Sequence, residues 1–219
     1  MDNKKKIAVV LSGCGVYDGS EIHEATLTLY AISKLGAEYQ IFAPDIDQFH
    51  VINHFTGEVT NEKRNVLVES ARIARGKIEP LSSFNVNEYD AIVFPGGFGA
   101  AKNLSTFAFK GSDCNVDSDT EKAVKGMFNS KKPIAALCIA PALIAKILGN
   151  VEVTIGNEEG TANAINKMGA IHKNSGPAEI VVDEKNKIVT TPCYMLQSNI
   201  SQIGEGAEKT IKAVLELIG

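Results

Sequence analysis

Short runs of consecutive apolar residues recur along the chain, and segments with helical periodicity separate them. The runs Ile7–Ser12, Ala91–Phe94 and Pro133–Leu137 are short and contain almost no polar residues. This pattern is typical of strands that are buried on both faces. Further strands are predicted at Tyr39–Phe42, Glu152–Ile155, Ile180–Asp183 and Lys187–Thr191, the last two joined by a turn.

Helical spacing of apolar residues lies between these predicted strands. Helices are predicted at Glu21–Lys34, at Thr120–Asn129, from Pro141 onward, at Glu158–Met168 and at Gly206–Ile218. Residues 45–64 are expected to form a loop, and Asn65–Arg75 is compatible with either a helix or a strand. The alternation predicts one α/β domain over residues 1–219, with a mostly parallel, doubly wound sheet that has helices on both faces.

Charge and hydropathy narrow the classes of function. The net charge is −4, and positive and negative residues are mixed along the chain without a basic stripe, so nucleic-acid binding is not expected. No apolar run approaches the length of a membrane-spanning helix, and no signal-peptide core is present. We therefore expect no membrane association and a cytoplasmic location.

The cysteines, histidines and first glycines do not form a recognisable cofactor motif. The four cysteines include no Cys-x-x-Cys pair, so they fit no zinc template. His50 and His54 have a helical metal-binding spacing but lie in the predicted loop. Gly13, Gly15 and Gly19 follow the first strand, but their spacing is one residue longer than the dinucleotide-binding fingerprint. We expect neither a metal nor an organic cofactor.

Cys138 stands at the junction between a predicted strand and a predicted helix. The strand is Pro133–Leu137, and Pro141 suits the first turn of the helix that follows. This position puts the sulfur at the rim of the sheet near the positive end of a helix, which favours the thiolate and predicts a lowered pKa. The alternative is an inert cysteine packed as a small hydrophobic residue.

Two further segments follow strands and are expected to reach the same rim of the sheet. Gly96 and Gly97 follow the strand Ala91–Phe94 and have no side chains, so a backbone N–H can closely face a ligand. With the N–H of Ile139, they can form an oxyanion hole. For each glycine taken singly, a tight turn that requires positive φ explains the residue equally well.

Acidic residues begin the helix after the first glycine-rich turn. Glu21 and Glu24 are one helical turn apart, and acids at this position also simply complement the helix dipole. Only one of them can easily point at the rim. A carboxyl group beside a thiolate is held protonated, because adjacent anions repel, and it can then shuttle a proton. His23 lies between the two and either lines the site or faces solvent.

Three motifs together resemble a known superfamily. They are Asp18–Glu24, Pro95–Leu104 and Leu137–Pro141. In these segments the chain resembles the ThiJ/PfpI superfamily, also called class I glutamine amidotransferase-like. Leu11–Gly19 and Val51–Glu58 add a narrower likeness to the ElbB type, which is described as isoprenoid biosynthesis or enhancing lycopene biosynthesis protein.

The resemblance implies a flavodoxin-like three-layer sandwich and a homodimer. It implies that Cys138 is a nucleophile paired with Glu24, and that the oxyanion donors are Gly97 and Ile139, with Gly96 beside them. ElbB-like proteins are similar to cofactor-independent glyoxalases, which convert the 2-oxoaldehydes methylglyoxal and glyoxal to lactate and glycolate. The activity implied is therefore that of a glutathione-independent glyoxalase, a lyase.

The chain departs from its relatives in one respect. Many of them carry a histidine about twenty residues after the cysteine, where this chain has Val153–Asn157. The third catalytic residue is therefore absent or supplied elsewhere, for example by His23. His172 has no glutamate two residues further on, which argues against glutaminase activity. Two alternatives stay open: a redox-responsive regulatory protein that uses Cys138, and a thiol hydrolase. The role of Cys14, which lies in the first glycine-rich turn, is also open.

Overall fold

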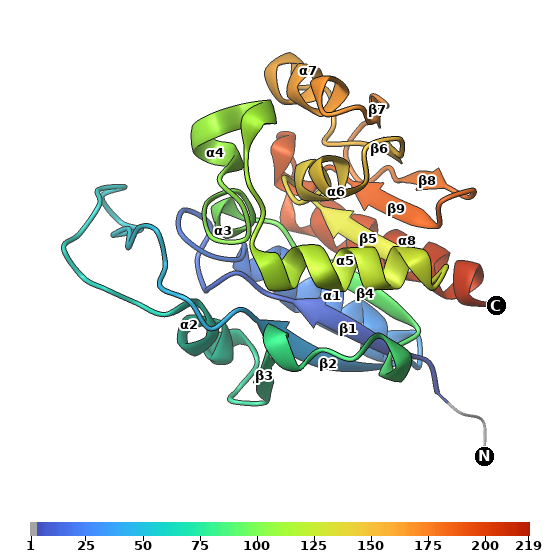
Figure 1. Ribbon diagram of the computed structural model, residues 1–219, viewed down its shortest axis with the longest axis horizontal. Coiled ribbons are helices and arrows are strands. Elements are labelled where there is room, and N and C mark those ends of the chain that lie inside the picture. The colour runs from blue at the N-terminus through green and yellow to red at the C-terminus, as the bar shows by residue number, and fades with distance from the viewer. Residues whose placement is uncertain (1–3) are drawn as a thin grey trace.

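The computed structural model describes residues 4–219 and contains a seven-stranded sheet (Figure 1). The strand order is β3-β2-β1-β4-β5-β9-β8, and every pairing is parallel except that of β8 with β9. The strands are β1 (Lys6–Val10), β2 (Glu38–Ala43), β3 (Ile78–Pro80), β4 (Ala91–Phe94), β5 (Ile134–Leu137), β8 (Val181–Asp183) and β9 (Ile188–Thr191). The predicted mostly parallel, doubly wound sheet is confirmed.

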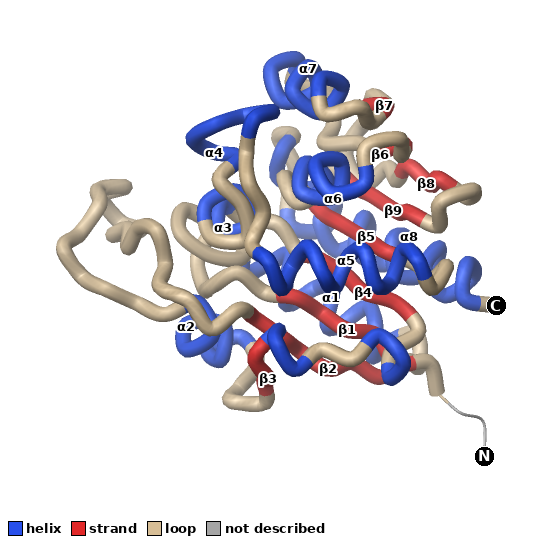
Figure 2. The backbone as a smooth tube through the Cα atoms, in the orientation of Figure 1, coloured by secondary structure: helices blue, strands red, loops and turns tan. Residues whose placement is uncertain are grey.

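Helices cover both faces of this sheet, so the molecule has three layers (Figure 2). The helices are α1 (Ile22–Lys34), α2 (Val66–Ile73), α3 (Phe98–Lys102), α4 (Phe107–Lys110), α5 (Ser118–Asn129), α6 (Pro141–Leu148), α7 (Glu159–Lys167) and α8 (Ile200–Ile218). Apolar residues of α1 and α8 pack on one face, and those of α5 and α6 pack on the other. No helix within residues 4–219 is long and apolar enough to cross a membrane.

Successive side chains of the central strands enter opposite halves of the core. In β5, Ile134 and Ala136 join the cluster under α5 and α6, whereas Ala135 and Leu137 join the cluster under α1 and α8. This two-residue alternation explains why the strands read as continuous apolar runs, since both faces of the sheet are buried. Cys138 belongs to the α1 and α8 side.

Several elements differ from the sequence-based expectations or settle what these left open. Asn65–Arg75 resolves as α2, with the Asn65 side chain accepting a hydrogen bond from the N–H of Val68. β3 was not predicted, because it is short and ends in Pro80, which an edge strand tolerates. The last helix begins at Ile200, where Asn199 and Gln202 form a capping box that Gly204 and Gly206 obscured in the sequence.

The predicted strand Glu152–Ile155 is shorter than expected and lies outside the main sheet. Its first two residues form β6 (Glu152–Val153), which pairs only with β7 (Ile171–His172) in a separate two-stranded ribbon. Thr154 turns away from this pairing, since its N–H donates to the Thr190 hydroxyl oxygen at 2.9 Å. Residues 45–64 form a long excursion with isolated bridges, as expected for a loop.

Candidate active site

Cys138 occupies a sharp turn between β5 and α6. Its φ is +59°, a left-handed conformation that a residue with a side chain rarely adopts. The N–H of Cys138 donates to the carbonyl of Thr191 at 2.9 Å, so the turn is held against the end of β9. The residue is 7 % exposed. A strained, well-anchored residue at a strand end is a common feature of functional sites.

Glu24 lies directly against this turn from the first turn of α1. It is completely buried, with one carboxyl oxygen accepting from the N–H of Gly96 at 3.0 Å and the other from the N–H of Tyr194 at 3.3 Å. Its carboxyl group is within hydrogen-bonding reach of the Cys138 sulfur. Glu21 has a different position, because its carboxylate caps α1 by accepting from the N–H of Glu24 at 2.7 Å.

Gly96 lies between the side chains of Cys138 and Glu24. A methyl group at this position would lie 2.6 Å from a carboxyl oxygen of Glu24, 2.9 Å from the carbonyl of Leu137, and against the Cβ of Cys138. Gly97 has a φ of +96°, and a side chain there would collide with the backbone of Glu21. Glycine at both positions therefore follows from close packing around the cysteine and from backbone geometry.

The electrostatics of the pair differ in part from the sequence-based expectation. Burial raises the pKa of Glu24 from 4.5 to about 8, and the neighbouring charge of Glu21 adds to this rise. The carboxyl group is therefore mainly protonated at neutral pH, as predicted, but burial and Glu21 are the causes and a thiolate is not, since the hydrogen bond with Cys138 lowers this pKa. The prediction of a lowered pKa for Cys138 is wrong. Burial raises the pKa of that thiol well above its ordinary value, and the charge of Glu24 raises it further.

Two backbone N–H groups oppose this rise in the pKa of the Cys138 thiol. Those of Gly97 and Ile139 hydrogen-bond to the sulfur and lower its pKa. They are the two donors predicted for an oxyanion hole, and here they face the Cys138 sulfur itself. Cys138 and Glu24 thus form a coupled acid pair, whose shared titration belongs to both groups.

His23 lies at the edge of the site and does not replace the missing histidine at Cys138. Its Nδ1 is 2.9 Å from the hydroxyl of Tyr194, and its side chain is exposed. The link to the pair is indirect, through the backbone N–H of Tyr194 that binds Glu24. Tyr194 carries no sequence signal of its own, because its role here depends on a backbone group at the end of β9.

The first glycine-rich turn packs against the 45–64 loop. Asp18 accepts a hydrogen bond from the N–H of Ile52 at 2.7 Å, and His54 accepts one from the N–H of Tyr17 at 3.2 Å. Cys14 is half-buried in this turn, with the charges of Glu69 and Arg72 close to its sulfur. No group of three or more metal-binding side chains is found among residues 4–219.

His172 has a local structural contact. Its Nε2 accepts a hydrogen bond from the N–H of Ile155 at 3.2 Å. Burial lowers the pKa of this imidazole, which favours the neutral acceptor form. His172 therefore fixes the backbone after β6, in keeping with the argument against glutaminase activity.

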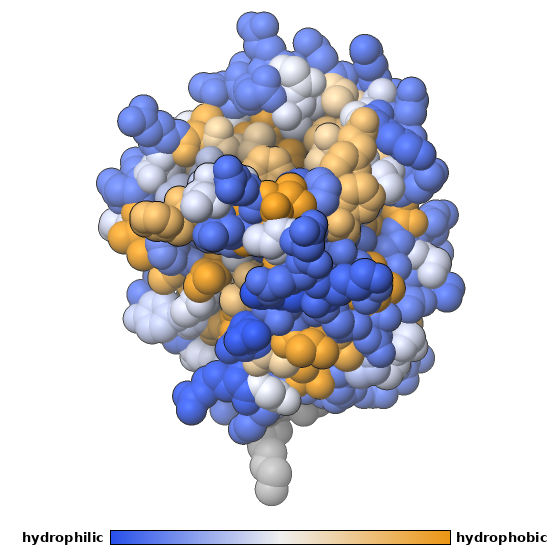
Figure 3. Space-filling view, turned by 90° about the vertical axis from the view of Figure 1, so that its left-hand side faces the viewer, coloured by the Kyte–Doolittle hydropathy of each residue, from blue (hydrophilic) through white to orange (hydrophobic). Residues whose placement is uncertain are grey.

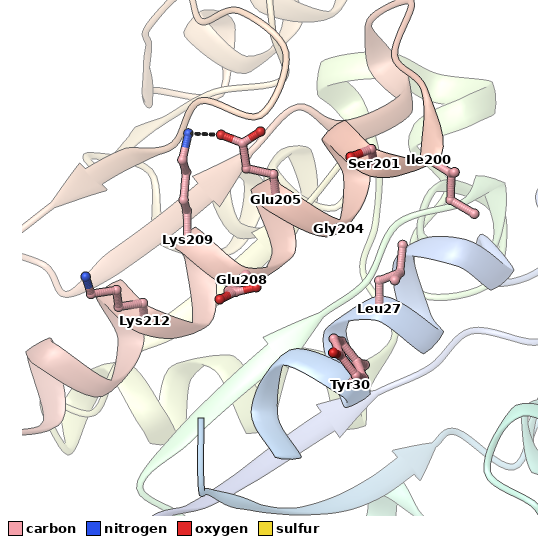
Figure 4. A pocket seen from close by; sticks show the side chains of 9 residues that line it. All are labelled: Leu27, Tyr30, Ile200, Ser201, Gly204, Glu205, Glu208, Lys209 and Lys212. Carbon is pink, nitrogen blue, oxygen red and sulfur yellow. Dashed lines mark ion pairs between the residues drawn. The ribbon is translucent and has the colours of Figure 1, made fainter. Parts of the chain in front are cut away.

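The carboxyl edge of the sheet and a groove between two helices are the notable surfaces. Figure 3 looks toward the edge where α3, α4 and the 45–64 loop lie, and shows scattered hydrophobic patches among hydrophilic residues. The side chains of Phe49, Phe55 and Phe109 are exposed on these elements. A groove of about 730 Å³ lies between α1 and α8, with Leu27, Tyr30 and Ile200 on its walls (Figure 4). Its lining includes none of the predicted site residues.

A doubly wound sheet with a cysteine elbow and a buried glutamate at its carboxyl edge defines a class of α/β proteins with a cysteine-centred site. The chain belongs to the DJ-1/PfpI family, whose model it matches over residues 6–193. The resemblance to the ThiJ/PfpI, glutamine amidotransferase-like superfamily is thereby confirmed.

Several relatives extend this result over nearly the whole chain. The chain is 51 % identical to the ES1 protein homolog, mitochondrial, of Rattus norvegicus, over 99 % of this chain and 85 % of that protein. It is 51 % identical to the human glutamine amidotransferase-like class 1 domain-containing protein 3, mitochondrial, over 98 % and 84 % of the two chains.

Solved structures agree with the fold. An isoprenoid biosynthesis protein with an amidotransferase-like domain from Ehrlichia chaffeensis has a TM-score of 0.90 and 36 % identity, covering 96 % of this chain and 99 % of that one. Glyoxalase III from Candida albicans has a TM-score of 0.61 and 16 % identity, covering 95 % and 97 %. This second likeness shows a shared fold.

The predicted cytoplasmic location is contradicted by these comparisons. The rat and human relatives, each 51 % identical to this chain, and an ES1 protein of Danio rerio, 38 % identical, are all named as mitochondrial. Composition and apolar runs within a folded domain do not identify its compartment, because targeting depends on segments that are recognised apart from the fold.

Proposed function

We propose that this protein is a cofactor-independent glyoxalase that converts a small 2-oxoaldehyde, such as methylglyoxal or glyoxal, to the corresponding 2-hydroxy acid. One observation carries the proposal. A buried carboxyl group with a pKa raised to about 8 lies against a cysteine sulfur that two backbone N–H groups also face. Such a pair supplies a nucleophile, a proton carrier and an oxyanion site in one place.

The first step joins the thiol to the aldehyde. The ionised form of Glu24, which is the minor form at neutral pH because the pKa is about 8, takes the proton of the Cys138 thiol. The sulfur attacks the aldehyde carbon of the substrate. The carbonyl oxygen becomes an oxyanion, which the N–H groups of Gly97 and Ile139 stabilise. Glu24 then returns the proton to this oxygen, giving a neutral hemithioacetal and a carboxylate base.

The second step moves a proton between the two carbons of the substrate. The Glu24 carboxylate removes the hydrogen from the former aldehyde carbon, which gives an enediolate and a protonated Glu24. The hydroxyl proton of the former aldehyde carbon passes to the oxygen of the neighbouring carbon. Protonated Glu24 then delivers its proton to the neighbouring carbon, and the product is a thioester of the hydroxy acid. Water hydrolyses the thioester and restores the thiol. The net reaction adds one water to the 2-oxoaldehyde.

The site favours small substrates and this reaction over thiol hydrolysis. Cys138 is 7 % exposed, which leaves little room for a bulky acyl group at the sulfur. A hydrolase of the cysteine type relies on a histidine base close to the thiol. The described contacts of His23 and His172 are with Tyr194 and Ile155 respectively. The side chain that lies beside the sulfur is the buried carboxyl group of Glu24, so we assign the role of the base to Glu24.

Lactate formation from methylglyoxal tests the proposal. Purified protein is incubated with methylglyoxal without glutathione, and lactate is followed by proton NMR. We expect turnover by the wild type and by Cys14→Ser, a matched control in a half-buried cysteine away from the pair. We expect none from Cys138→Ser. Equal lactate formation by Cys138→Ser, or none by the wild type, contradicts the proposal.

We also propose that the protein is a homodimer, as the family resemblance implied. The exposed apolar side chains of Tyr30 and Ile200 along the α1 and α8 groove are compatible with an interface between copies. Sedimentation equilibrium of the wild type and of Tyr30→Glu checks this. A dimer that the substitution weakens supports the groove as the interface, and a monomeric wild type rules out the dimer.

A further inference from the structure

A second buried cysteine lies beside Cys138 and has no part in the proposed reaction. Cys193 immediately follows Pro192 at the end of β9, the strand paired with β5. It is 2 % exposed, and it belongs to the same core cluster as Cys138, on the α1 and α8 side of the sheet. The two cysteines therefore project to one side of two neighbouring strand ends.

Strand pairing brings the two segments together. The last paired residues of these strands are Leu137 and Thr191, so Cys138 is one residue beyond the ladder and Cys193 is two. Neighbouring strands lie about 5 Å apart, and a disulfide joins Cα atoms that are about 4.4–6.8 Å apart. The N–H of Cys138 donates to the carbonyl of Thr191 at 2.9 Å, which holds the Cys138 turn against the chain two residues before Cys193.

Both cysteines have the same unusual backbone conformation. The φ values are +59° for Cys138 and +45° for Cys193, a region that residues with side chains rarely adopt. Glu24 lies against both turns, because it accepts hydrogen bonds from the N–H of Tyr194, the residue after Cys193, and from that of Gly96, which packs against Cys138. Its charge also raises the pKa of each thiol. A shared local environment for two thiols points to a reaction between them.

We propose that Cys193 is the resolving partner of Cys138, so that a hydroperoxide converts the pair to an intramolecular disulfide. The Cys138 thiolate attacks the terminal oxygen of the hydroperoxide. The O–O bond breaks, an alcohol or water leaves, and Cys138 becomes a sulfenic acid. The Cys193 thiol then attacks the sulfenic sulfur, its proton leaves with the hydroxyl group as water, and the disulfide forms.

The difference in exposure sets the order of these events. Cys138 is the more exposed of the two, at 7 % against 2 %, so the oxidant reaches it first. Cys193 then captures the sulfenic acid before a second oxidant molecule can convert it to sulfinic acid, which thiols do not reduce. The disulfide blocks the nucleophile reversibly and preserves it from permanent loss.

Mass spectrometry tests the disulfide independently of any glyoxalase activity. Reduced protein is treated with stoichiometric hydrogen peroxide, the remaining thiols are alkylated, and the peptides are mapped. We expect the wild type to lose two alkylatable thiols, to yield a peptide linking Cys138 and Cys193, and to recover both thiols in dithiothreitol. Cys114→Ser, which alters a buried cysteine elsewhere, is expected to behave as the wild type.

Removal of the resolving cysteine sharpens the test. In Cys193→Ser treated with at least two equivalents of hydrogen peroxide, we expect Cys138 to gain two oxygen atoms and to remain oxidised after dithiothreitol. The wild type under the same conditions is expected to form the disulfide. Cys138 sulfinic acid in the peroxide-treated wild type, with Cys193 fully alkylated, overturns the proposal. If Cys193→Ser does not fold, the linked peptide in the wild type still decides, because its absence under these conditions contradicts the pairing.

Discussion

The molecule contains two glycine-rich turns that follow neighbouring parallel strands, and they have different roles. The turn after β1 contains Gly15, where a side chain would meet the imidazole of His54 and a carboxyl oxygen of Asp18. The turn after β4 contains Gly96, where a side chain would meet Cys138 and Glu24. Similar motifs therefore serve loop packing in one case and the candidate active site in the other, and the neighbouring side chains decide which.

Substitution of Cys138, the proposed nucleophile at the second turn, is expected to have the largest effect on the reaction rate. Cys138→Ser keeps the size of the side chain but replaces the sulfur with a weakly acidic hydroxyl, so we expect the rate of lactate formation to fall by about a thousandfold or more. The melting temperature should change little. Initial rates from methylglyoxal and a thermal melt measure both. Retention of more than a tenth of the wild-type rate would rule out covalent catalysis by Cys138.

Gly96→Ala is expected to have the next largest effect. The new methyl group would overlap the Cys138 Cβ and lie 2.6 Å from a Glu24 oxygen. Relief of this overlap moves the reacting groups apart, and a misplacement of about 1 Å lowers the turnover rate by about a hundredfold. Kinetic constants show whether kcat falls. An unchanged kcat would separate this turn from the reaction.

The matched change in the other turn is Gly15→Ala. The φ of Gly15 is +131°, which alanine adopts at a free-energy cost of about 1–3 kcal/mol. The clashing atom belongs to the partly exposed His54 side chain, which can move. We expect a lower free energy of unfolding by urea and nearly wild-type kcat for the folded fraction. A loss of kcat as large as that of Gly96→Ala would erase the distinction between the turns.

Glu24→Gln is expected to change the pH dependence of stability. Burial raises the pKa of Glu24 from 4.5 to about 8 in the folded protein, so the folded state holds a proton that the unfolded state loses across this interval. The free energy of unfolding therefore falls as pH rises from about 4.5 to about 8.

Glutamine has no such titration, so the fall should be smaller in Glu24→Gln. Its amide group can accept from only one of the two N–H donors, at Gly96 and Tyr194, so overall stability also drops. Urea titrations at several pH values measure both effects. Parallel pH profiles for the two proteins would show that Glu24 is not the group responsible.

Tyr194→Phe is expected to have the smallest effect. It removes the hydroxyl that contacts His23 at the exposed edge of the site but keeps the backbone N–H that binds Glu24. An exposed hydrogen bond of this kind contributes about 1 kcal/mol or less, so kcat should stay within about tenfold of the wild type. A larger loss would give the His23 and Tyr194 pair a direct part in proton transfer.

The sequence predicted the central sheet well because its signals are local. The apolar runs of β1, β4 and β5 show burial on both faces, and Pro141 marks the start of α6. The relation of Cys138, Gly96 and Glu24 was also predictable, since all three follow from strand ends and the family motifs. The short edge strand β3 and the ribbon of β6 and β7 depend on tertiary pairing, which periodicity does not record.

The parts of the site that the sequence did not predict depend on burial and on backbone groups. A helix N-terminus predicts a lowered pKa for Cys138, but burial, together with the charge of Glu24, reverses the direction. Tyr194 contributes a backbone N–H and Cys193 a sulfur from the end of β9. Cys193 was visible as a cysteine, but only the register of β5 with β9 places it next to Cys138.

The alkylation rate of Cys138 as a function of pH shows whether Cys138 and Glu24 form one coupled acid pair. Iodoacetamide labelling of the wild type and Glu24→Gln is followed by peptide mass spectrometry. Removal of the Glu24 charge should shift the midpoint for Cys138 to lower pH, because that charge raises the thiol pKa. Coincident midpoints in two folded proteins would contradict the coupling and the mechanism built on it.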